Sequence, residues 1–210
     1  MDRHHSIEIR NLSYTYPDGN RALSDVSLAV GHGEKVGIIG PNGAGKTTLL
    51  LHLNGIRRGE GTVLIEGVPV GKETLRAIRS KVGLVFENPD DQLFCPTIFD
   101  DVAFGLLNMR VPRDEVPQRV RETLIRVGLE GYERRSSFHI SLGEKKRAAM
   151  ATVLAMQPPI LVLDEPAGNL DPKNRRELIH FLQMLDQTMV MASHDLDMVL
   201  EICSRAVILN

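Results

Sequence analysis

The sequence predicts an α/β fold in which a sheet of buried strands carries an antiparallel β subdomain and an inserted α-helical subdomain. Two continuous apolar runs, residues 160–166 and 188–193, have the length and composition of strands that are buried on both faces. Residues 6–16 instead alternate apolar and polar side chains, which is typical of an antiparallel strand with one face in water. Between about Asp100 and Met156 the strand-like runs give way to helical spacing. An α/β core interrupted by a helical insert accounts for this order.

The amino-terminal part of the chain is expected to alternate strands and turns before its first helix. After the alternating run, PDGN at 17–20 is a turn, and VSLAV at 26–30 is typical of the next strand. EKVGIIG at 34–40 predicts a further strand that leads into a glycine-rich segment. KTTLLLHLNG then predicts a helix that ends at Gly55, because glycine is favoured directly after the last helical turn.

The remaining strands flank the helical insert. TVLIEG at 62–67 predicts a strand, and VGLVF at 82–86 predicts a buried one. After the insert the core resumes with the two buried runs ILVLDEP and TMVMAS, and AVIL at 206–209 predicts the last strand.

Length and composition are those of one globular domain. The chain has 210 residues, 42% of them hydrophobic and 25% charged, which argues against disorder. We expect a single domain, 1–210, in which 1–87 and 157–210 form the α/β core and 88–156 form the helical subdomain. The net charge of −2 gives no electrostatic reason to expect nucleic acid or an anionic membrane surface as a partner.

Cysteine content and the absence of long apolar runs argue against disulfide-rich, zinc-binding, secreted and membrane-spanning proteins. Cys95 and Cys203 are the only cysteines, and no Cys/His cluster has ligand spacing, so we expect neither a disulfide framework nor a structural zinc site. The start, MDRHHSIEIR, lacks the apolar run of a signal peptide. No stretch approaches the roughly 18 consecutive apolar residues of a membrane span. We expect a soluble, cytoplasmic protein, for which any membrane role would come through a partner.

A phosphate-binding motif follows the strand at 34–40. The segment from Gly40 to Thr47, GPNGAGKT, fits the pattern G-x-x-x-x-G-K-[ST], in which glycines let backbone N–H groups turn towards the α- and β-phosphates. Lys46 would reach the β- and γ-phosphates, and the Thr47 hydroxyl would join the Mg²⁺ shell. A chance glycine-rich turn is disfavoured because a predicted strand precedes the motif and a predicted helix follows it. The motif predicts a P-loop NTPase (RecA-like) core. The expected nucleotide-binding residues are Asn42, Gly43, Ala44, Gly45, Lys46, Thr47 and Thr48.

Two adjacent acids end the buried strand ILVLDEP. Ligands bind at the carboxyl ends of strands in parallel sheets, so Asp164 would hold Mg²⁺ directly or through water. Glu165 would orient or deprotonate the attacking water. The structural alternative is a pair of solvated acids at a strand–loop junction. The phosphate loop upstream favours the catalytic interpretation, because phosphoryl transfer needs a metal-binding carboxylate.

Together these motifs resemble the nucleotide-binding subunit of an ATP-binding-cassette (ABC) transporter over nearly the whole chain. The resemblance implies an ATPase with ATP and Mg²⁺ as cofactors. Tyr16, ahead of PDG, resembles the aromatic residue that stacks on adenine in this family. An aromatic side chain packed on a strand is the structural alternative, and Tyr14 is the second candidate for the adenine contact.

Two further positions take their roles from the resemblance. NLD at 169–171 resembles the loop that passes between two subunits, with Asp171 as its key residue, whereas the local sequence GNLDP is also a turn. SHD at 193–195 places His194 where the family has a histidine that senses the γ-phosphate. The filled hydrolytic positions, Glu165 and His194, argue against a regulatory nucleotide-binding module without turnover.

The sequence SLGEK at 141–145 resembles the family signature, usually Leu-Ser-Gly-Gly-Gln. The resemblance implies that two ATPase subunits, identical or different, pack head to tail. Ser141 and the Gly143 N–H would then contact the γ-phosphate of the ATP held by the partner's phosphate loop, aided by the helix N-terminus.

The same segment also fits a purely structural role. Ser141-x-x-Glu144 is a capping box, although capping alone would need neither Gly143 nor the basic run 145–147. Both roles can hold at once. Leu142 and Glu144 depart from the usual glycine and glutamine of the signature, which we expect to weaken the γ-phosphate contacts without removing them.

Glu87 is a third departure from the family pattern. The family usually has glutamine here, where it touches Mg²⁺ and the water and relays nucleotide occupancy to the membrane partner. Glutamate keeps an oxygen ligand for the metal but adds a negative charge and loses the amide donor. We expect a metal site with altered affinity or pH response, and we do not expect Gln92 to substitute for Glu87.

The segments YTYPDGNRAL, ENPDDQLFCPTIFDDVAFG and LGEKKRAAMATVLAMQP are most similar to ATPases of energy-coupling-factor importers, particularly the cobalt and nickel type. This resemblance implies a peripheral protein on the cytoplasmic face of the membrane. Its partners would be a transmembrane scaffold protein and a small substrate-binding membrane protein. The alternative is a non-transport cassette ATPase that acts on nucleic acid or ribosomes, which would normally carry coiled-coil arms or tandem cassettes. The chain shows neither, and no basic stripe favours nucleic acid.

Overall fold

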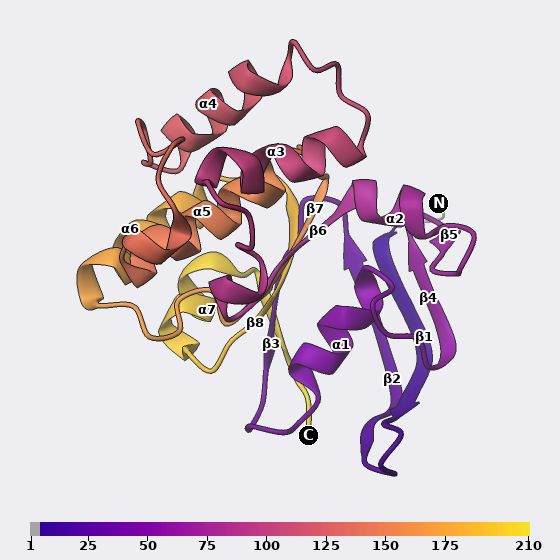
Figure 1. Ribbon diagram of the computed structural model, residues 1–210. Coiled ribbons are helices and arrows are strands. Elements are labelled where there is room, and N and C mark those ends of the chain that lie inside the picture. Colours follow the sequence, from indigo (N-terminus) through magenta and orange to yellow (C-terminus); the bar gives the residue numbers. More distant parts are fainter. Residues whose placement is uncertain (1–4) are drawn as a thin grey trace.

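Two β-sheets organise the protein, whose residues 5–210 are described in a computed structural model (Figure 1). The antiparallel sheet has the order β2-β1-β4-β5, and the core sheet has the order β6-β7-β8-β3-β9 with parallel pairing throughout. The strands of the antiparallel sheet are β1 (His5–Thr15), β2 (Arg21–Gly31), β4 (Glu60–Ile65) and β5 (Val68–Pro69). Those of the core sheet are β3 (Lys35–Ile39), β6 (Val82–Val85), β7 (Ile160–Asp164), β8 (Thr188–Ala192) and β9 (Arg205–Ile208).

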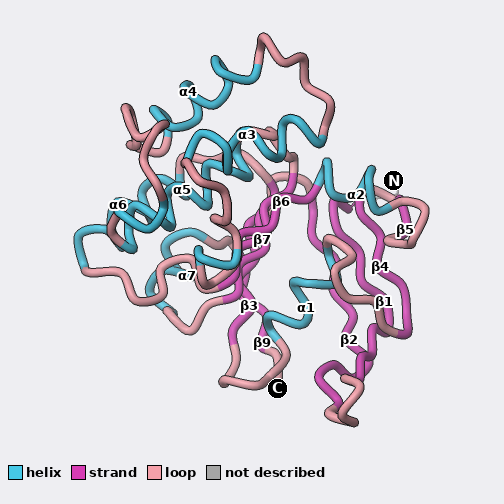
Figure 2. Tube along the Cα trace, in the orientation of Figure 1, coloured by secondary structure: helices cyan, strands magenta, loops and turns pink. Residues whose placement is uncertain are grey.

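Helices cover both faces of the core sheet (Figure 2). Those nearest the amino terminus are α1 (Lys46–Leu53) and α2 (Leu75–Lys81). Between β6 and β7 the described chain contains only helices, namely α3 (Ile98–Asn108), α4 (Val116–Arg126), α5 (Leu142–Leu154) and the 3₁₀ turns Pro89–Asp91 and Ser137–His139. The last two helices are α6 (Pro172–Gln183) and α7 (Leu196–Ile202).

The strand predictions are confirmed, with one difference in extent at β2. The predicted strand 26–30 begins earlier, at Arg21, because Tyr14 and Thr15 of β1 pair with Leu23 and Arg21 directly across the turn. The polar residues before Val26 conceal this part of the strand in the sequence, although the backbone ladder continues through them.

Alternating side chains of the core strands build two separate apolar layers. One layer joins the core strands to α1 and the antiparallel sheet, through residues such as Val36, Ile38, Val162, Val190 and Leu50. The other joins the same strands to α3, α5, α6 and α7, through residues such as Leu161, Leu163, Met191, Ala151 and Leu182. Each fully buried Leu, Ile or Val contributes about 1.5–3 kcal/mol relative to an exposed position. Helices α1 and α5 therefore lie on opposite faces of the core sheet.

Because the core strands are parallel, their carboxyl ends meet at one edge of the sheet. The register pairs Val85 with Leu163, and Asp164 with Ala192, while Ala192 also pairs with Ile38. The loops that follow β6, β7, β8 and β3 consequently lie side by side. This edge collects the segments in which the sequence placed its candidate site.

Candidate functional site

The phosphate loop connects β3 to α1 and has the backbone that the motif predicts. Gly45 has φ +91°, and a Cβ there would lie 2.3 Å from the carbonyl oxygen of Ala22, so only glycine fits. Gly45 is also the N-cap of α1 and provides no side chain to cap it. The first N–H groups of α1 therefore remain available to an anion.

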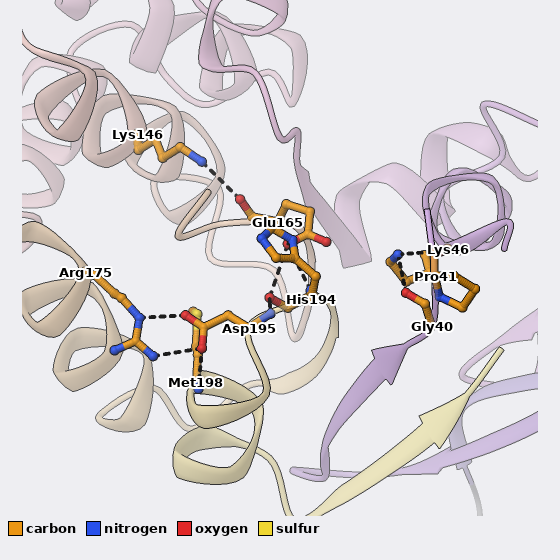
Figure 3. A network of polar contacts seen from close by, with 10 residues as sticks. Gly40, Pro41, Lys46, Lys146, Glu165, Arg175, His194, Asp195 and Met198 are labelled. Carbon is orange, nitrogen blue, oxygen red and sulfur yellow. Dashed lines mark hydrogen bonds and ion pairs between the residues drawn. The ribbon is translucent and has the colours of Figure 1, made fainter. Parts of the chain in front are cut away.

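Lys46 places a cation over this loop. The residue is 8% exposed, and its Nζ donates to the carbonyl oxygens of Gly40 at 2.9 Å and Pro41 at 3.1 Å (Figure 3). The ammonium group is thus held beside the backbone groups that would surround a phosphate. A β- or γ-phosphate would be a stronger, charged acceptor for the same donors.

Asp164 ends β7 next to Thr47, which follows the loop lysine. The Asp164 carboxylate is buried, and its Oδ1 has no hydrogen-bond partner among residues 5–210. Burial raises the pKa of Asp164, hydrogen bonding to Thr47 lowers it, and the charges of Glu87 and Glu165 raise it again. An unpartnered carboxylate oxygen beside a threonine hydroxyl fits Mg²⁺, which is commonly held by one or two protein oxygens together with substrate phosphates and water.

Glu165 follows directly and is turned towards the end of β8. Its Oε2 lies 2.8 Å from Nδ1 of His194 and accepts from the Ser193 hydroxyl and the His194 backbone N–H, both at 3.2 Å (Figure 3). The backbone of Glu165 has φ +41°, an uncommon left-handed conformation for this residue type. Three donors from one loop therefore orient the carboxylate that the sequence assigned as the base.

A further ion pair supports the His194 loop and was not found by sequence reasoning. Arg175 of α6 binds Asp195 through two bonds, Nε to Oδ2 at 2.6 Å and Nη2 to Oδ1 at 2.8 Å. Asp195 also caps α7 by accepting from Met198 N at 3.0 Å. The arginine lowers the pKa of Asp195. The only sequence signal was the position of Asp195 next to His194, and nothing indicated Arg175.

Tyr16 lies against the start of α1. Its hydroxyl forms a hydrogen bond with the hydroxyl of Thr48 at 2.9 Å, and the guanidinium of Arg57 lies 5.4 Å from the ring centroid. Tyr14 packs edge-on against both Tyr16 and His52, with ring centroids 5.0 Å apart in each pair. The half-buried Tyr16 thus stands beside the phosphate-loop helix, and the adenine contact stays a prediction.

The capping box at the start of α5 is present, as the structural interpretation of SLGEK predicts. Glu144 Oε2 accepts from Ser141 N at 2.7 Å, and Ser141 Oγ accepts from Glu144 N at 3.4 Å. Gly143 is buried, and a Cβ there would lie 2.7 Å from Oδ1 of Asn174 on α6. The packing of α5 against the Asn174 side chain therefore favours glycine whether or not a phosphate binds, and contact of Gly143 with a phosphate stays a prediction. Ser141 itself is exposed.

The basic run after the signature is engaged within the chain. Lys145 binds Asp90 at 2.6 Å, Lys146 donates to the backbone of Glu165, and Arg147 donates to Asn174 at 2.9 Å. In the sequence these cations favoured a ligand, but each has a hydrogen-bond or ion-pair partner within the chain. The exposed residues at the start of α5 are Ser141 and Leu142.

Asp171, predicted in the loop between subunits, is the N-cap of α6. It accepts from the backbone N–H groups of Lys173 at 3.0 Å and Asn174 at 3.1 Å, and Pro172 occupies the first helical position. The local sequence is therefore explained by helix capping, and contact with a second subunit stays a prediction.

Glu87 follows β6 and is exposed beside Asp164, whose pKa its charge raises. Gln92 has a different role. It accepts from Phe86 N at 3.2 Å and donates to the carbonyl of Ala149 at 2.8 Å and the hydroxyl of Thr152 at 2.7 Å. Gln92 thus braces the loop after β6 against α5, in agreement with the expectation that it does not replace Glu87.

A groove of about 1150 Å³ lies between α2, β6 and α3, on the far side of this loop. Its lining includes the exposed aromatic rings of Phe94 and Phe104, which pack edge-on at 5.1 Å. Asp101 also lines the groove and is 4% exposed, and its Oδ2 has no hydrogen-bond partner among the described residues. Among the described residues, no helix combines the length and apolarity that crossing a membrane requires.

Comparisons with known proteins agree with this geometry. The ABC transporter family model matches residues 23–168. An energy-coupling factor transporter ATP-binding protein, EcfA, of Methanothermobacter thermautotrophicus is 51% identical over 210 residues, covering 97% of this chain and 68% of that protein. The solved structure of cbiO1 from Clostridium perfringens, part of the ABC transporter complex cbiONQ, has a TM-score of 0.87 at 36% identity and covers 99% of this chain and 85% of that one.

A second solved structure shows the nucleotide chemistry of the fold. The ATP-binding cassette MJ0796, dimeric and bound to ADP and Pi in a post-hydrolysis state, has a TM-score of 0.87 at 28% identity, covering 97% of this chain and 94% of that one. A phosphate loop with its lysine and a metal-binding carboxylate at the same sheet edge are recurring parts of nucleotide hydrolysis in P-loop NTPases. The chain therefore belongs to the ABC transporter family, as an ATP-binding subunit that hydrolyses ATP and is similar to the energy-coupling-factor ATPases.

Proposed function

We propose that this chain powers an importer and hydrolyses MgATP at the interface of a head-to-tail dimer. The observation that carries this proposal is the placement of α1 and α5 on opposite faces of the core sheet. Ser141 is exposed at the start of α5, which packs on one face of the core sheet, whereas the phosphate loop of the same chain leads into α1 on the opposite face. A second subunit, identical or different, would bring its Ser141 to this phosphate loop.

Each candidate residue then has a chemical role. Backbone N–H groups of 42–48 and the Lys46 ammonium bind the phosphates, and the Tyr16 ring stacks on adenine. Glu165 orients and deprotonates the attacking water, while His194 holds Glu165 and faces the γ-phosphate. Ser141 and the start of α5 from the partner subunit would complete the phosphate contacts, and Asp171 would lie at the same interface.

Thr47, Asp164 and Glu87 would hold Mg²⁺ with the nucleotide. When bound, the ion neutralises charge on the β- and γ-phosphate oxygens. Asp164 supports this assignment, because its buried Oδ1 has no hydrogen-bond partner in the described part of the chain. Glu87 places an additional carboxylate at this point, so we expect metal affinity to depend more on pH than it would with glutamine.

The groove beside Phe94 and Phe104 is our candidate docking site for the transmembrane scaffold protein. Exposed aromatic side chains favour an apolar helix, and the unpartnered oxygen of Asp101 favours a cationic or hydrogen-bond donor side chain on that helix. The loop that contains Glu87 lies between this groove and the proposed nucleotide site. A movement of this loop would therefore affect both the docking groove and the nucleotide site. Docking would hold the ATPase peripherally on the cytoplasmic face of the membrane.

The solute is proposed to be cobalt or another transition metal ion. The similarity to cbiO1, described as part of the complex cbiONQ, and to EcfA supports an importer of the energy-coupling-factor type with a separate substrate-binding membrane protein. Uptake of radioactive cobalt and nickel by cells that carry the complete transporter tests the solute. If cells that carry an inactive ATPase take up as much cobalt and nickel as cells with the active one, the proposed solute is contradicted.

The dimer is tested by Ser141→Arg in a Glu165→Gln background, with ATP-dependent association followed by light scattering. We expect Ser141→Arg to block association while the ATP affinity of the monomer is unchanged. Ser24→Arg, an exposed serine on β2, is the matched control and should associate normally. Normal dimer formation by the Ser141→Arg variant would contradict the proposed head-to-tail arrangement.

A further inference from the structure

Lys146 enters the candidate site from the helical insert. Its Nζ donates to the backbone carbonyl of Glu165 at 3.0 Å, and Figure 3 shows the side chain reaching from α5 to that oxygen. Lys146 is 7% exposed, although lysine is rarely buried without a charged partner. No carboxylate of the described residues forms a direct ion pair with it. Such a group needs an explanation beyond packing.

The carbonyl that Lys146 contacts belongs to a constrained residue. Glu165 has φ +41°, and non-glycine residues persist in the left-handed region where several neighbours fix them. Its N–H donates to Ala192 at 2.9 Å, and its carbonyl also accepts from Gly168 N at 3.0 Å. Lys146 thus supplies the second donor to this carbonyl, and it is the one that comes from a different layer of the fold.

The two ends of Glu165 are held by different elements. The backbone carbonyl is bound by α5 through Lys146, while the side-chain Oε2 is bound by Ser193 and His194 after β8. The orientation of the peptide sets the point from which the side chain leaves the backbone. A shift of the carboxylate by about 1 Å is enough to lower a rate by about 100-fold.

The charge of Lys146 also faces the site. Burial lowers the pKa of Lys146, and the carboxylates of Glu87, Glu165 and Asp164 raise it. A buried charge usually stabilises a fold less than an apolar side chain of similar volume would. Burying the Lys146 charge lowers the stability of the fold compared with an apolar side chain. Its position at the backbone of the candidate base is therefore explained better by a role in function than by a role in stability.

We propose that Lys146 is a positioning residue for hydrolysis, which holds the peptide of Glu165 so that its carboxylate faces the reaction centre of the same subunit. This inference rests on the proposed role of Glu165. Lys146 lies on the helix that begins at Ser141, so the helix that meets the partner's ATP would also set the base of its own subunit.

The test compares single-turnover hydrolysis at saturating ATP with ATP affinity and melting temperature. Lys146→Met removes the donor and the charge, and we expect the rate to fall at least about tenfold. ATP affinity should stay within about twofold, and the melting temperature should be equal or higher, since an apolar side chain replaces a buried charge. Lys146→Arg, which keeps a charged donor, should recover most of the rate.

Lys35→Met is the matched control. In the wild-type chain the Lys35 Nζ donates to the carbonyls of Leu182 at 2.9 Å and Gln183 at 3.0 Å. Lys35 begins β3, at the end of the strand that is remote from the phosphate loop. This variant removes a lysine donor in the same way and should show no loss in single-turnover rate. A Lys146→Met rate within about twofold of wild type, or an equal loss in Lys35→Met, would overturn the inference. Lys146→Arg no faster than Lys146→Met would do the same.

The Glu165→Gln variant separates this inference from the function on which it rests. If Glu165→Gln still hydrolyses ATP, the proposed base is wrong. If Glu165→Gln is inactive and Lys146→Met is active, the base stands and the role of Lys146 alone fails.

Discussion

Replacing Glu165 by glutamine removes the proposed base while keeping the shape of the site. The Ser193 hydroxyl and the His194 N–H both donate to Oε2, and the amide oxygen of glutamine can accept from the same donors. We therefore expect the fold and ATP binding to be preserved. Loss of a positioned general base lowers a rate by about 100- to 10,000-fold, which corresponds to about 3–5 kcal/mol in activation free energy.

The assay is phosphate release in steady state and in a single turnover, with ATP affinity measured on the same preparation. Glu122→Gln, on the exposed surface of α4, makes the same chemical change away from the site and should retain full turnover. Glu165→Gln should also accumulate as an ATP-bound dimer. Unchanged phosphate release by Glu165→Gln would refute the assignment of the base.

Three further changes test parts of the site. Gly45→Ala should weaken ATP binding and lower stability by at least about 1 kcal/mol, measured by titration and urea unfolding, because alanine is strained at φ +91°; wild-type affinity would contradict this. Asp195→Asn should cost about 1–2 kcal/mol at pH 7 by weakening the pair with Arg175. The Arg175 guanidinium lowers the folded pKa of Asp195, so this stability is fully present above the unfolded value of about 3.9 and is lost as the pH falls through the folded pKa. The difference in urea unfolding should therefore shrink as the pH is lowered below about 3.9, and a pH-independent difference would contradict the ion pair. Ser141→Ala should cost about 1 kcal/mol through loss of the cap to Glu144, and an unchanged melting temperature would show that the cap is unimportant.

Local sequence patterns were sufficient for the phosphate loop and for the strands, except for the two-residue β5 and the first part of β2. Buried apolar runs identified β7 and β8, and the glycine pattern before Lys46 identified a loop whose geometry depends on its own residues. Helix α2 was not predicted, because it is short and buries a single residue, Ile78, so it has little periodic signal.

Contacts between distant segments could not be predicted in this way. Lys146 reaches Glu165 across 19 positions, and Arg175 reaches Asp195 across 20. Each pair depends on how a helix packs against the sheet, which no local pattern of charges encodes. The same applies to Gly143, whose lack of a side chain leaves room for Asn174 on α6.

The central claim is that the reaction centre is complete only when two subunits meet, and the dependence of specific ATPase activity on protein concentration tests it most directly. With saturating MgATP, activity per molecule should fall steeply as the protein is diluted below the concentration at which it self-associates. Activity per molecule that stays constant far below that concentration would show that one chain contains the whole catalytic site.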